Sequence, residues 1–383
     1  MALRRAWLLP LLLAATAALP LLVAAKRPTL RFSNDGTFKI IQLTDLHYGS
    51  LSFRDKRTTE VQTKVLEAEK EGMGLVVFSG DMVTGFMEYV DAALDKMVGS
   101  GGNQSGWFEQ QWKKVVAPVH NLSLPYCITL GNHDAQADLD GRYRFPLAPQ
   151  IVQLDIDTGK HLTLTQQGPA NITGASNYWL DVLASNSSAV AARIWVLDSG
   201  MKGCDGDNES WGCVAADTAQ WVAETAATLP PVDTHIAYLH IPPIQVLEVW
   251  NNESTRGFKD EPSGCSQVDS GAFAALRDAG VQAIFFGHDH DNCFYGELDG
   301  VRVGYGRKTG VGNYGPPRDV ARGARVVLLR EGESAADAET WIRNEAGKRE
   351  DDQPSDAENK VMFEQGECGT PNSWGEKLVA LMG

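Results

Sequence analysis

The feature that most constrains the fold is a set of five short apolar runs, each ending in side chains able to bind a metal ion. Such runs are typical of buried strands, and in α/β sheets ligands collect where strands end. Five of the eight histidines of the chain lie in these polar ends. The ends are Asp45–His47, Gly80–Val83, Gly131–Asp134, His240–Pro243 and Gly287–His290. We therefore expect them to meet at one edge of a sheet.

The wider pattern predicts a layered α/β fold. Runs rich in Val, Ile, Leu and aromatic residues, bounded by Gly, Pro, Asn or Asp, are typical of strands. They are Phe38–Leu43, Leu75–Phe78, Tyr126–Leu130, Arg193–Leu197, His235–Leu239, Ala283–Phe286, Val301–Tyr305 and Ala324–Leu329. Helices are predicted at Thr58–Glu71, at Asp217–Thr228 with Asp217 as its cap, and at Ser270–Ala279. The strands from Ala283 onward follow one another without long helices, which indicates a mixed sheet or a second sheet.

Both ends of the chain are predicted to lie outside the folded domain. Arg4 and Arg5 precede an apolar run that ends in small residues at Ala25, the pattern of a secretory signal peptide. The run is long enough that an uncleaved membrane anchor is the alternative. The charged and small residues 345–359 are typical of a solvated linker. We thus expect a signal peptide or anchor (1–25), one domain (26–345), and a charged linker with a C-terminal tail (346–383).

Sequons and cysteines favour an exported glycoprotein, either secreted or luminal, in the extracellular space or a vacuole. An oxidising compartment permits disulfides. Cys204 and Cys213 bracket a short loop that a disulfide can close, and a bridge between Cys265 and Cys293 would brace the loop at Gly287. The sequons begin at Asn103, Asn121, Asn171, Asn186, Asn208 and Asn252.

The formal net charge of −15 narrows the class of partner. Nucleic acids and anionic membranes repel a chain of this charge. We therefore expect no nucleic-acid partner, and membrane contact only if the N-terminal segment is uncleaved. The oligomeric state leaves no mark in the sequence.

The polar ends have the chemistry that a pair of metal ions requires. Two ions about 3.5–4 Å apart need a carboxylate between them, with neutral imidazoles or amide oxygens around them. Side chains two residues apart on an extended chain point the same way, so we expect Asp45 and His47 to face one side. Gly80 lets the backbone turn sharply before Asp81. Asp, Asn and His ligands without a thiolate suit iron, manganese, zinc or magnesium to varying degrees, and we expect iron, manganese or zinc.

Together these segments resemble the calcineurin-like metallophosphoesterase superfamily, and more closely its purple-acid-phosphatase-like branch that begins with Asp-x-His. The similar stretch runs from about Phe38 to about Leu329. The resemblance implies a four-layer sandwich of two packed mixed β-sheets flanked by α-helices. It implies a first metal held by Asp45, His47, Asp81 and His290, and a second held by Asp81, Asn132, His240 and His288. It also implies that His133 lies beside the scissile phosphate, donating a hydrogen bond or a proton, and that Asp134 orients its imidazole.

The implied activity is hydrolysis of small phosphomonoesters by in-line attack of a metal-bridging hydroxide. One alternative is a phosphodiesterase or nucleotide-cleaving enzyme, whose pocket must admit two ester groups. The other is a binding scaffold without turnover, which the complete ligand set and His133 disfavour.

Two features near the motifs have their own consequences. Purple acid phosphatases have a tyrosine, which binds ferric iron and gives the colour, three residues after the Gly-Asp aspartate. Thr84 holds that position here, so we expect a protein that is not purple. A Gly-rich loop after Val301–Tyr305 carries Arg307, Lys308, Asn313 and Tyr314. We expect the charges of Arg307 and Lys308 to be solvated; the alternative is a loop that lines the pocket, with Arg307 at a phosphate.

Overall fold

The computed structural model describes residues 27–85, 87, 106–136, 148–252, 254–317, 319–351, 353 and 366–371. The predicted signal peptide or anchor at 1–25 and the sequon at Asn103 lie outside these residues. Within the described ranges, no helix has the length and apolar composition needed to cross a membrane.

The first large sheet has six strands. They are β1 (Thr37–Leu43), β2 (Met73–Ser79), β3 (Tyr126–Thr129), β13 (Gly323–Arg330), β14 (Glu339–Asn344) and β15 (Arg349–Glu350). Their order across the sheet is β15-β14-β13-β1-β2-β3. β1, β2 and β3 run parallel, whereas β13, β14 and β15 add antiparallel pairs on the other side of β1. The carboxyl ends of the three parallel strands therefore meet at one edge.

The second large sheet has seven strands. They are β4 (Tyr178–Leu183), β5 (Val190–Val196), β8 (Thr234–Tyr238), β9 (Arg256–Lys259), β10 (Ala283–Phe286), β11 (Asn292–Leu298) and β12 (Val301–Tyr305). Their order is β4-β5-β8-β10-β12-β11-β9, with β5, β8, β10 and β12 parallel. A separate hairpin is formed by β6 (Lys202–Cys204) and β7 (Asp207–Trp211).

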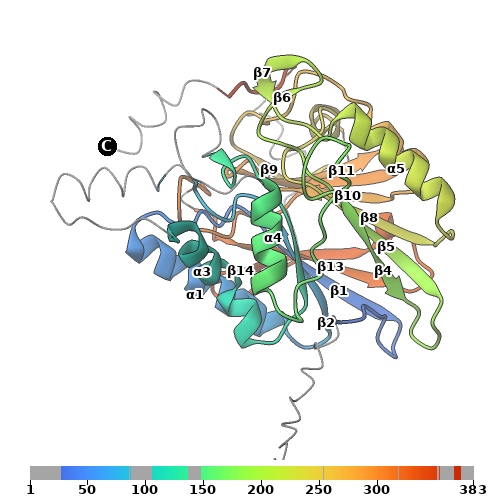
Figure 1. Cartoon of the computed structure of the whole chain (residues 1–383), viewed down its shortest axis with the longest axis horizontal. Coiled ribbons are helices and arrows are strands. Elements are labelled where there is room, and N and C mark those ends of the chain that lie inside the picture. The colour runs from blue at the N-terminus through green and yellow to red at the C-terminus, as the bar shows by residue number, and fades with distance from the viewer. Residues whose placement is uncertain are drawn as a thin grey trace, which may run out of the picture.

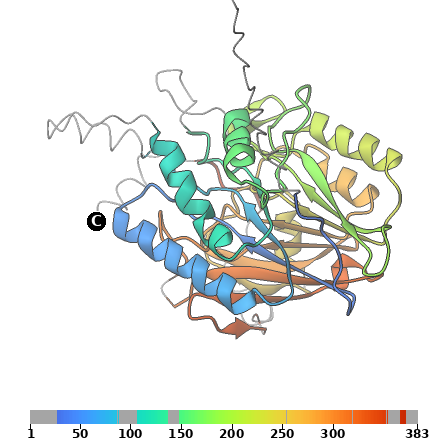
Figure 2. The same ribbon diagram turned by 60° about the horizontal axis from the view of Figure 1, so that its bottom comes forward.

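Helices cover the outer face of each sheet, so the molecule has four layers (Figures 1 and 2). On the first sheet lie α1 (Ser52–Glu69), α3 (Trp107–Asn121) and α4 (Ala148–Thr158). On the second lie α5 (Ala216–Thr228), α6 (Val246–Trp250) and α7 (Ala272–Asp278), and a short 3-10 turn, η2 (Ala335–Asp337), precedes β14. The predicted four-layer sandwich with two mixed sheets is confirmed.

The strands divide their side chains between two cores. In β1, Ile41 and Leu43 pack toward the helices, while Phe38 and Ile40 face the other sheet. Both kinds of position are apolar because a strand between two covered faces has no solvent side. This explains why the predicted runs have no alternating pattern, and all of them are strands in the structure.

Two details of the predicted helices are corrected. α1 begins at Ser52, ahead of the predicted Thr58. α5 begins without a side-chain cap, and Asp217 instead accepts hydrogen bonds from the backbone N–H and the hydroxyl of Thr173. The carboxylate thus fastens a neighbouring loop to the helix, a long-range contact that the local sequence does not reveal.

The predicted linker at 345–359 is wrong in its first part. Arg349 and Glu350 form β15, which pairs with β14 at the border of the first sheet. The Asn344 side chain accepts hydrogen bonds from the backbone N–H groups of Ala346 and Lys348 and so closes the turn between the two strands. Charged residues are common on such edges, so the composition of an edge strand resembles that of a linker. The domain division itself stays a prediction.

One of the two expected disulfides is confirmed and the other is wrong. Cys204 and Cys213 are bonded. Cys265 is bonded to Cys368 in the C-terminal segment, with a Cα–Cα distance of 5.1 Å. Cys293 is a buried free thiol in β11, 3.3 Å from Nε2 of Gln353. The sequence distance between cysteines does not say which way a strand turns its side chains.

Glu69, the last residue of α1, attaches that helix to the first sheet. Its buried carboxylate accepts hydrogen bonds from Nε1 of Trp341 (2.8 Å), Nε of Arg343 (2.7 Å) and Nζ of Lys39 (3.0 Å). Burial alone would raise its pKa, but these donors lower the pKa below the ordinary 4.5. A lowered pKa in the folded state means that the carboxylate stabilises the fold above pH 4.5, and that this stability is lost as the pH falls through the folded-state pKa.

We expect Glu69→Gln to lower the free energy of unfolding at neutral pH by about 3 kcal/mol, because two cationic side chains lose their buried partner. Below pH 4.5 the difference from the wild type should shrink, since the wild-type residue then also becomes neutral. Urea unfolding at neutral and acidic pH measures both values. The exposed Glu60 of the same helix provides the control Glu60→Gln, and a difference that did not change with pH would contradict the assignment.

Candidate metal centre

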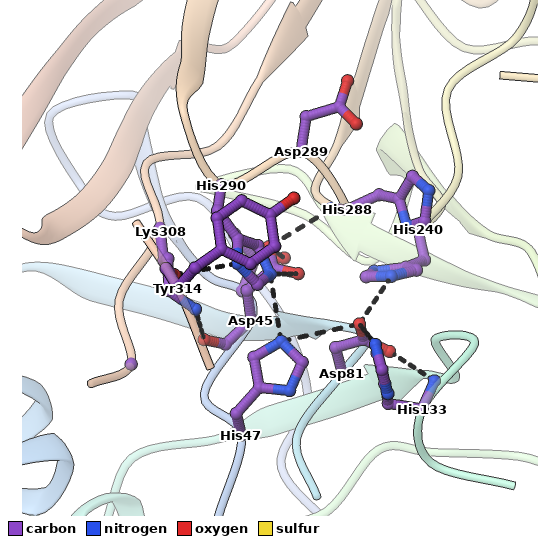
Figure 3. Close-up of polar contacts among 12 residues, drawn as sticks. Asp45, His47, Asp81, His133, His240, His288, Asp289, His290, Lys308 and Tyr314 are labelled. Carbon is purple, nitrogen blue, oxygen red and sulfur yellow. Dashed lines mark hydrogen bonds and ion pairs between the residues drawn. The ribbon is translucent and has the colours of Figure 1, made fainter. Parts of the chain in front are cut away.

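The structure brings the seven predicted ligands together at one edge of the two sheets. Figure 3 labels all of them except Asn132. They follow five different strands and all are buried. Asp45 and His47 follow β1, Asp81 follows β2, Asn132 follows β3, His240 follows β8, and His288 and His290 follow β10. Each large sheet therefore supplies part of the cluster.

The first group comprises Asp45, His47, Asp81 and His290. One ligand atom from each lies within 4.8 Å of the ligand atoms of the others. Nε2 of His47 lies 3.0 Å from Nε2 of His290, and Nε2 of His290 lies 3.5 Å from Oδ1 of Asp45. This is the set predicted for the first metal ion.

The second group shares Asp81 with the first. Asp81, His240 and His288 also place one ligand atom each within 4.8 Å of one another. Nε2 of His240 lies 3.3 Å from Oδ2 of Asp81 and 3.1 Å from Oδ1 of Asn132. The central position of Asp81 is the one that a carboxylate between two ions must occupy.

Hydrogen bonds behind the rings fix which nitrogen faces the centre. Nδ1 of His240 donates to the carbonyl oxygen of Ser79 (2.8 Å), and Nδ1 of His290 donates to that of Tyr314 (2.9 Å). Nδ1 of His47 lies 3.0 Å from the hydroxyl of Thr84. In His240 and His290, Nε2 is therefore the ring nitrogen directed at the cluster, where a metal ion would bind it.

Two buried atoms in the cluster fit a cation directly. Oδ1 of Asp45 and Nδ1 of His288 have no hydrogen-bond partner among the described residues. Buried polar atoms are nearly always paired, so two buried ligand atoms without a hydrogen-bond partner fit a positively charged partner. The donor set of carboxylates, an amide oxygen and imidazoles suits divalent ions.

The pKa values of these side chains follow from burial and from Asp81. Burial lowers the pKa of His47 and His288 well below the ordinary 6.5, which keeps both imidazoles neutral. Burial would raise the pKa of Asp81, but the facing imidazoles of His240 and His133 lower it well below its usual range. The same carboxylate raises the pKa of His240 to about 9, against the effect of burial. Asp81 is thus held as an ionised carboxylate at the centre of the cluster.

The backbone at the ligands is held in an uncommon conformation. Asp45, His47, Asp81 and His288 have φ angles of 54°, 52°, 52° and 79°. Residues with side chains occupy this left-handed region rarely and at a cost of about 1–3 kcal/mol each, and such strain concentrates at functional sites. The four strained residues belong to the predicted ligands, so the fold sustains the strain where the ligands must converge.

Glycine is required where two of these loops touch. A Cβ on Gly131 would lie 2.3 Å from the backbone nitrogen of Asp81, and a Cβ on Gly287 would lie 1.9 Å from Oγ1 of Thr44. Gly131 and Gly287 therefore allow the loops to approach closely, beyond the local turn that the sequence suggested.

His133 lies beside the cluster, but Asp134 does not orient it. Nδ1 of His133 lies 2.8 Å from Oε1 of Gln136, and Nε2 lies 3.9 Å from Oδ2 of Asp81. Both oxygens of Asp134 accept backbone N–H groups, from Val83 (2.9 Å) and Gly131 (2.8 Å). The predicted role of Asp134 is therefore wrong. Its carboxylate joins the loops after β2 and β3, and Gln136 contacts the imidazole.

The family model that matches this chain is the calcineurin-like phosphoesterase, over residues 38–292. The chain belongs to the calcineurin-like phosphoesterase family. This covers β1 to the start of β11, and thus all five polar segments. The matched region contains both groups of Asp and His side chains described above.

Similar proteins include plant relatives whose names describe them as "probable inactive" purple acid phosphatases. The "Probable inactive purple acid phosphatase 29" of Arabidopsis thaliana is 28% identical over 85% of this chain and 86% of its own. The "Probable inactive purple acid phosphatase 28" of the same plant is 28% identical over 82% of this chain and 79% of its own. A solved dimetal phosphatase from Danio rerio is 14% identical, covers 82% of this chain and 97% of its own, and has a TM-score of 0.47.

Thr84 gives this calcineurin-like phosphoesterase a spectroscopic prediction. Its hydroxyl contacts Nδ1 of His47, where it supports the imidazole from behind. No phenolate can be contributed from this position, so we expect no visible charge-transfer band from the iron-loaded protein. An absorption spectrum measures this, with Thr84→Tyr as the comparison. A purple wild-type protein would refute the prediction.

The Gly-rich loop after β12 is less exposed than the sequence predicts. Arg307 and Lys308 are buried, and Nζ of Lys308 donates to the carbonyl oxygen of Asp45 (3.1 Å). The Tyr314 ring packs on His290 with centroids 4.2 Å apart. Charged side chains in a glycine-rich stretch usually indicate a solvent-exposed loop. This loop is buried because β12 lies next to β10 in the sheet, so that the segments after both strands meet at the metal centre.

Proposed function

We propose that this chain is a metal-dependent phosphatase that hydrolyses small phosphomonoesters with two bound ions of iron, manganese or zinc. The observation that carries the proposal is the pair of orphaned ligand atoms, Asp45 Oδ1 and His288 Nδ1, within a shared cluster of buried donors. A merely structural polar core would have paired these atoms. When bound, the ions would supply Lewis-acid charge and a water deprotonated near neutral pH.

His133 is the residue we assign to proton transfer or hydrogen bonding at the phosphate. Nδ1 of His133 lies 2.8 Å from Oε1 of Gln136, and Nε2 lies on the side of the metal centre, 3.9 Å from Oδ2 of Asp81. The backbone N–H of His133 donates to Oδ1 of Asp81 (2.7 Å), which fixes the imidazole relative to the shared carboxylate. An imidazole suits this task because its proton exchanges near working pH.

A non-catalytic member of the family is the second candidate. It is favoured by the names of the Arabidopsis relatives, which call those proteins inactive. The ligands predicted for both ions and His133 are present in this chain, which favours turnover. The two candidates differ in whether bound metal leads to hydrolysis, and not in whether metal binds.

The test is metal analysis of the purified protein together with turnover of an aryl phosphate monoester and the matching diester. Two bound ions with faster monoester cleavage are the expected result. Faster diester cleavage would indicate a phosphodiesterase instead. Two bound ions without turnover would support the non-catalytic candidate, and absence of bound metal would overturn the proposal.

We also propose that the protein passes through the secretory pathway as a glycoprotein. The disulfides Cys204–Cys213 and Cys265–Cys368 agree with an oxidising compartment. Four sequon asparagines are exposed and so accessible to a glycan, namely Asn121, Asn171, Asn186 and Asn208. The mass of the protein from a eukaryotic secretory host, measured before and after treatment with an N-glycosidase, tests this. A loss of mass on treatment is the expected result. The net charge of −15 supports a small phosphorylated substrate over a nucleic-acid partner.

A further inference from the structure

His288 is held differently from the other histidines of the metal centre. His47, His240 and His290 each have a hydrogen bond to Nδ1 behind the ring. In the described part of the chain, neither ring nitrogen of His288 has such a partner. Metal-binding imidazoles are normally oriented by a hydrogen bond from the second nitrogen, so another contact must set the direction of this ring.

Among the described residues, Trp211 makes the closest ring contact with His288. The two ring centroids lie 4.4 Å apart with an interplanar angle of 80°, so one ring meets the other edge to face. The only other ring contact described for His288 is with His240, at 5.3 Å. Edge-to-face packing fixes an angle as well as a distance. A backbone atom of the loop at Gly264 closes the remaining side, because a Cβ there would lie 2.6 Å from Nε2 of His288.

Trp211 is itself held by a cross-linked hairpin. It is the last residue of β7, and its backbone pairs with Lys202 of β6. The Cys204–Cys213 disulfide closes the hairpin two residues beyond the tryptophan. Oγ of Ser210 lies 3.3 Å from Oγ of Ser266, which joins the hairpin to the loop beside His288. The β6–β7 hairpin lies outside both large sheets (Figure 1), and these links hold its half-buried Trp211 in place.

We infer that Trp211 is a positioning residue for the second metal ion, acting through His288. Its ring replaces the missing hydrogen bond and holds Nδ1 of His288 toward Asp81 and His240. The disulfide hairpin keeps the indole in place. This inference rests on the metal site of the proposed function, but it concerns binding of an ion and not hydrolysis.

The test is a calorimetric titration of the metal-free protein with Zn²⁺. Metal analysis after gel filtration then gives the number of ions that stay bound. In Trp211→Ala the dissociation constant of one Zn²⁺ should rise about 10- to 100-fold, the usual effect of removing a group that orients a ligand. The other Zn²⁺ should bind as in the wild type, since the first group does not include His288. Trp211→Phe should restore most of the affinity because it keeps an aromatic edge.

The control is Trp221→Ala, which removes another half-buried indole whose described ring contacts are Trp179 and Trp195. It should leave both Zn²⁺ sites intact. The double variant Cys204→Ser with Cys213→Ser keeps Trp211 but frees the hairpin, and it should weaken the same Zn²⁺ site. Wild-type affinity at both sites in Trp211→Ala, or equal weakening at both, would overturn the inference. So would a wild-type chain that binds fewer than two Zn²⁺. Two tightly bound ions without turnover would instead contradict only the proposed phosphatase activity.

Discussion

Asp81→Asn is expected to remove tight binding of both metal ions and to lower kcat/KM by about 10³-fold or more, equal to about 4 kcal/mol of transition-state stabilisation. The shared carboxylate is the one side chain common to both ligand groups. Asparagine keeps an oxygen for the backbone N–H of His133 and removes only the charge. Metal content and aryl phosphate turnover measure the two effects on the same sample.

A matched control is Asp155→Asn. Asp155 is also fully buried, but it accepts hydrogen bonds from Trp112, Tyr126 and Thr163, away from the cluster. This variant should retain two ions even where its stability falls. An Asp81→Asn protein with unchanged metal content and activity would remove the basis of the assigned centre.

His133→Ala is expected to lower kcat by about 10²- to 10³-fold while both metal ions remain bound. The imidazole is buried beside Asp81 but belongs to neither ligand group, so its loss should separate chemistry from metal binding. Steady-state kinetics and metal analysis on the same preparation test this. Loss of one ion together with the activity would show that His133 is a ligand instead.

A substitution of Gln136 should have a smaller effect on kcat than the removal of His133, because Gln136 acts only through the His133 imidazole. Gln136→Ala removes the contact with Nδ1 of His133 and should lower kcat by about tenfold, less than removal of the ring itself. His235→Asn is the control, because His235 lies at β8 and contacts the backbone of Gln282 away from the cluster. It should leave kcat unchanged.

The ligand positions could be predicted because they depend on local rules. Apolar runs identify strands between two covered faces, and polar residues directly after them must lie at a sheet edge. Asp45, His47, Asp81, His288 and His290 were therefore identifiable without knowledge of the strand order. The same reasoning located Asn132 and His240.

What the sequence could not predict depends on the direction of side chains and on contacts between distant segments. Asp134 is next to His133 in the chain, yet its carboxylate turns to the backbone of Val83 and Gly131. Cys265 meets Cys368 across a sequence separation of 103 residues, which no local pattern specifies. Trp211 gave no signal either, because an aromatic residue in a short polar hairpin is usually packing.

The ligand groups draw on both halves of the sandwich, since Asp45, His47 and Asp81 extend from the first sheet and His240, His288 and His290 from the second. Metal ions bound between the two sheets would therefore stabilise their packing. A ligand that binds only the folded state raises the free energy of unfolding by about 4 kcal/mol when its concentration is a thousandfold above its dissociation constant. A family member without catalytic activity would still need the bound ions for the stability of its fold. An intact set of donors can therefore outlive the reaction for which it was first selected.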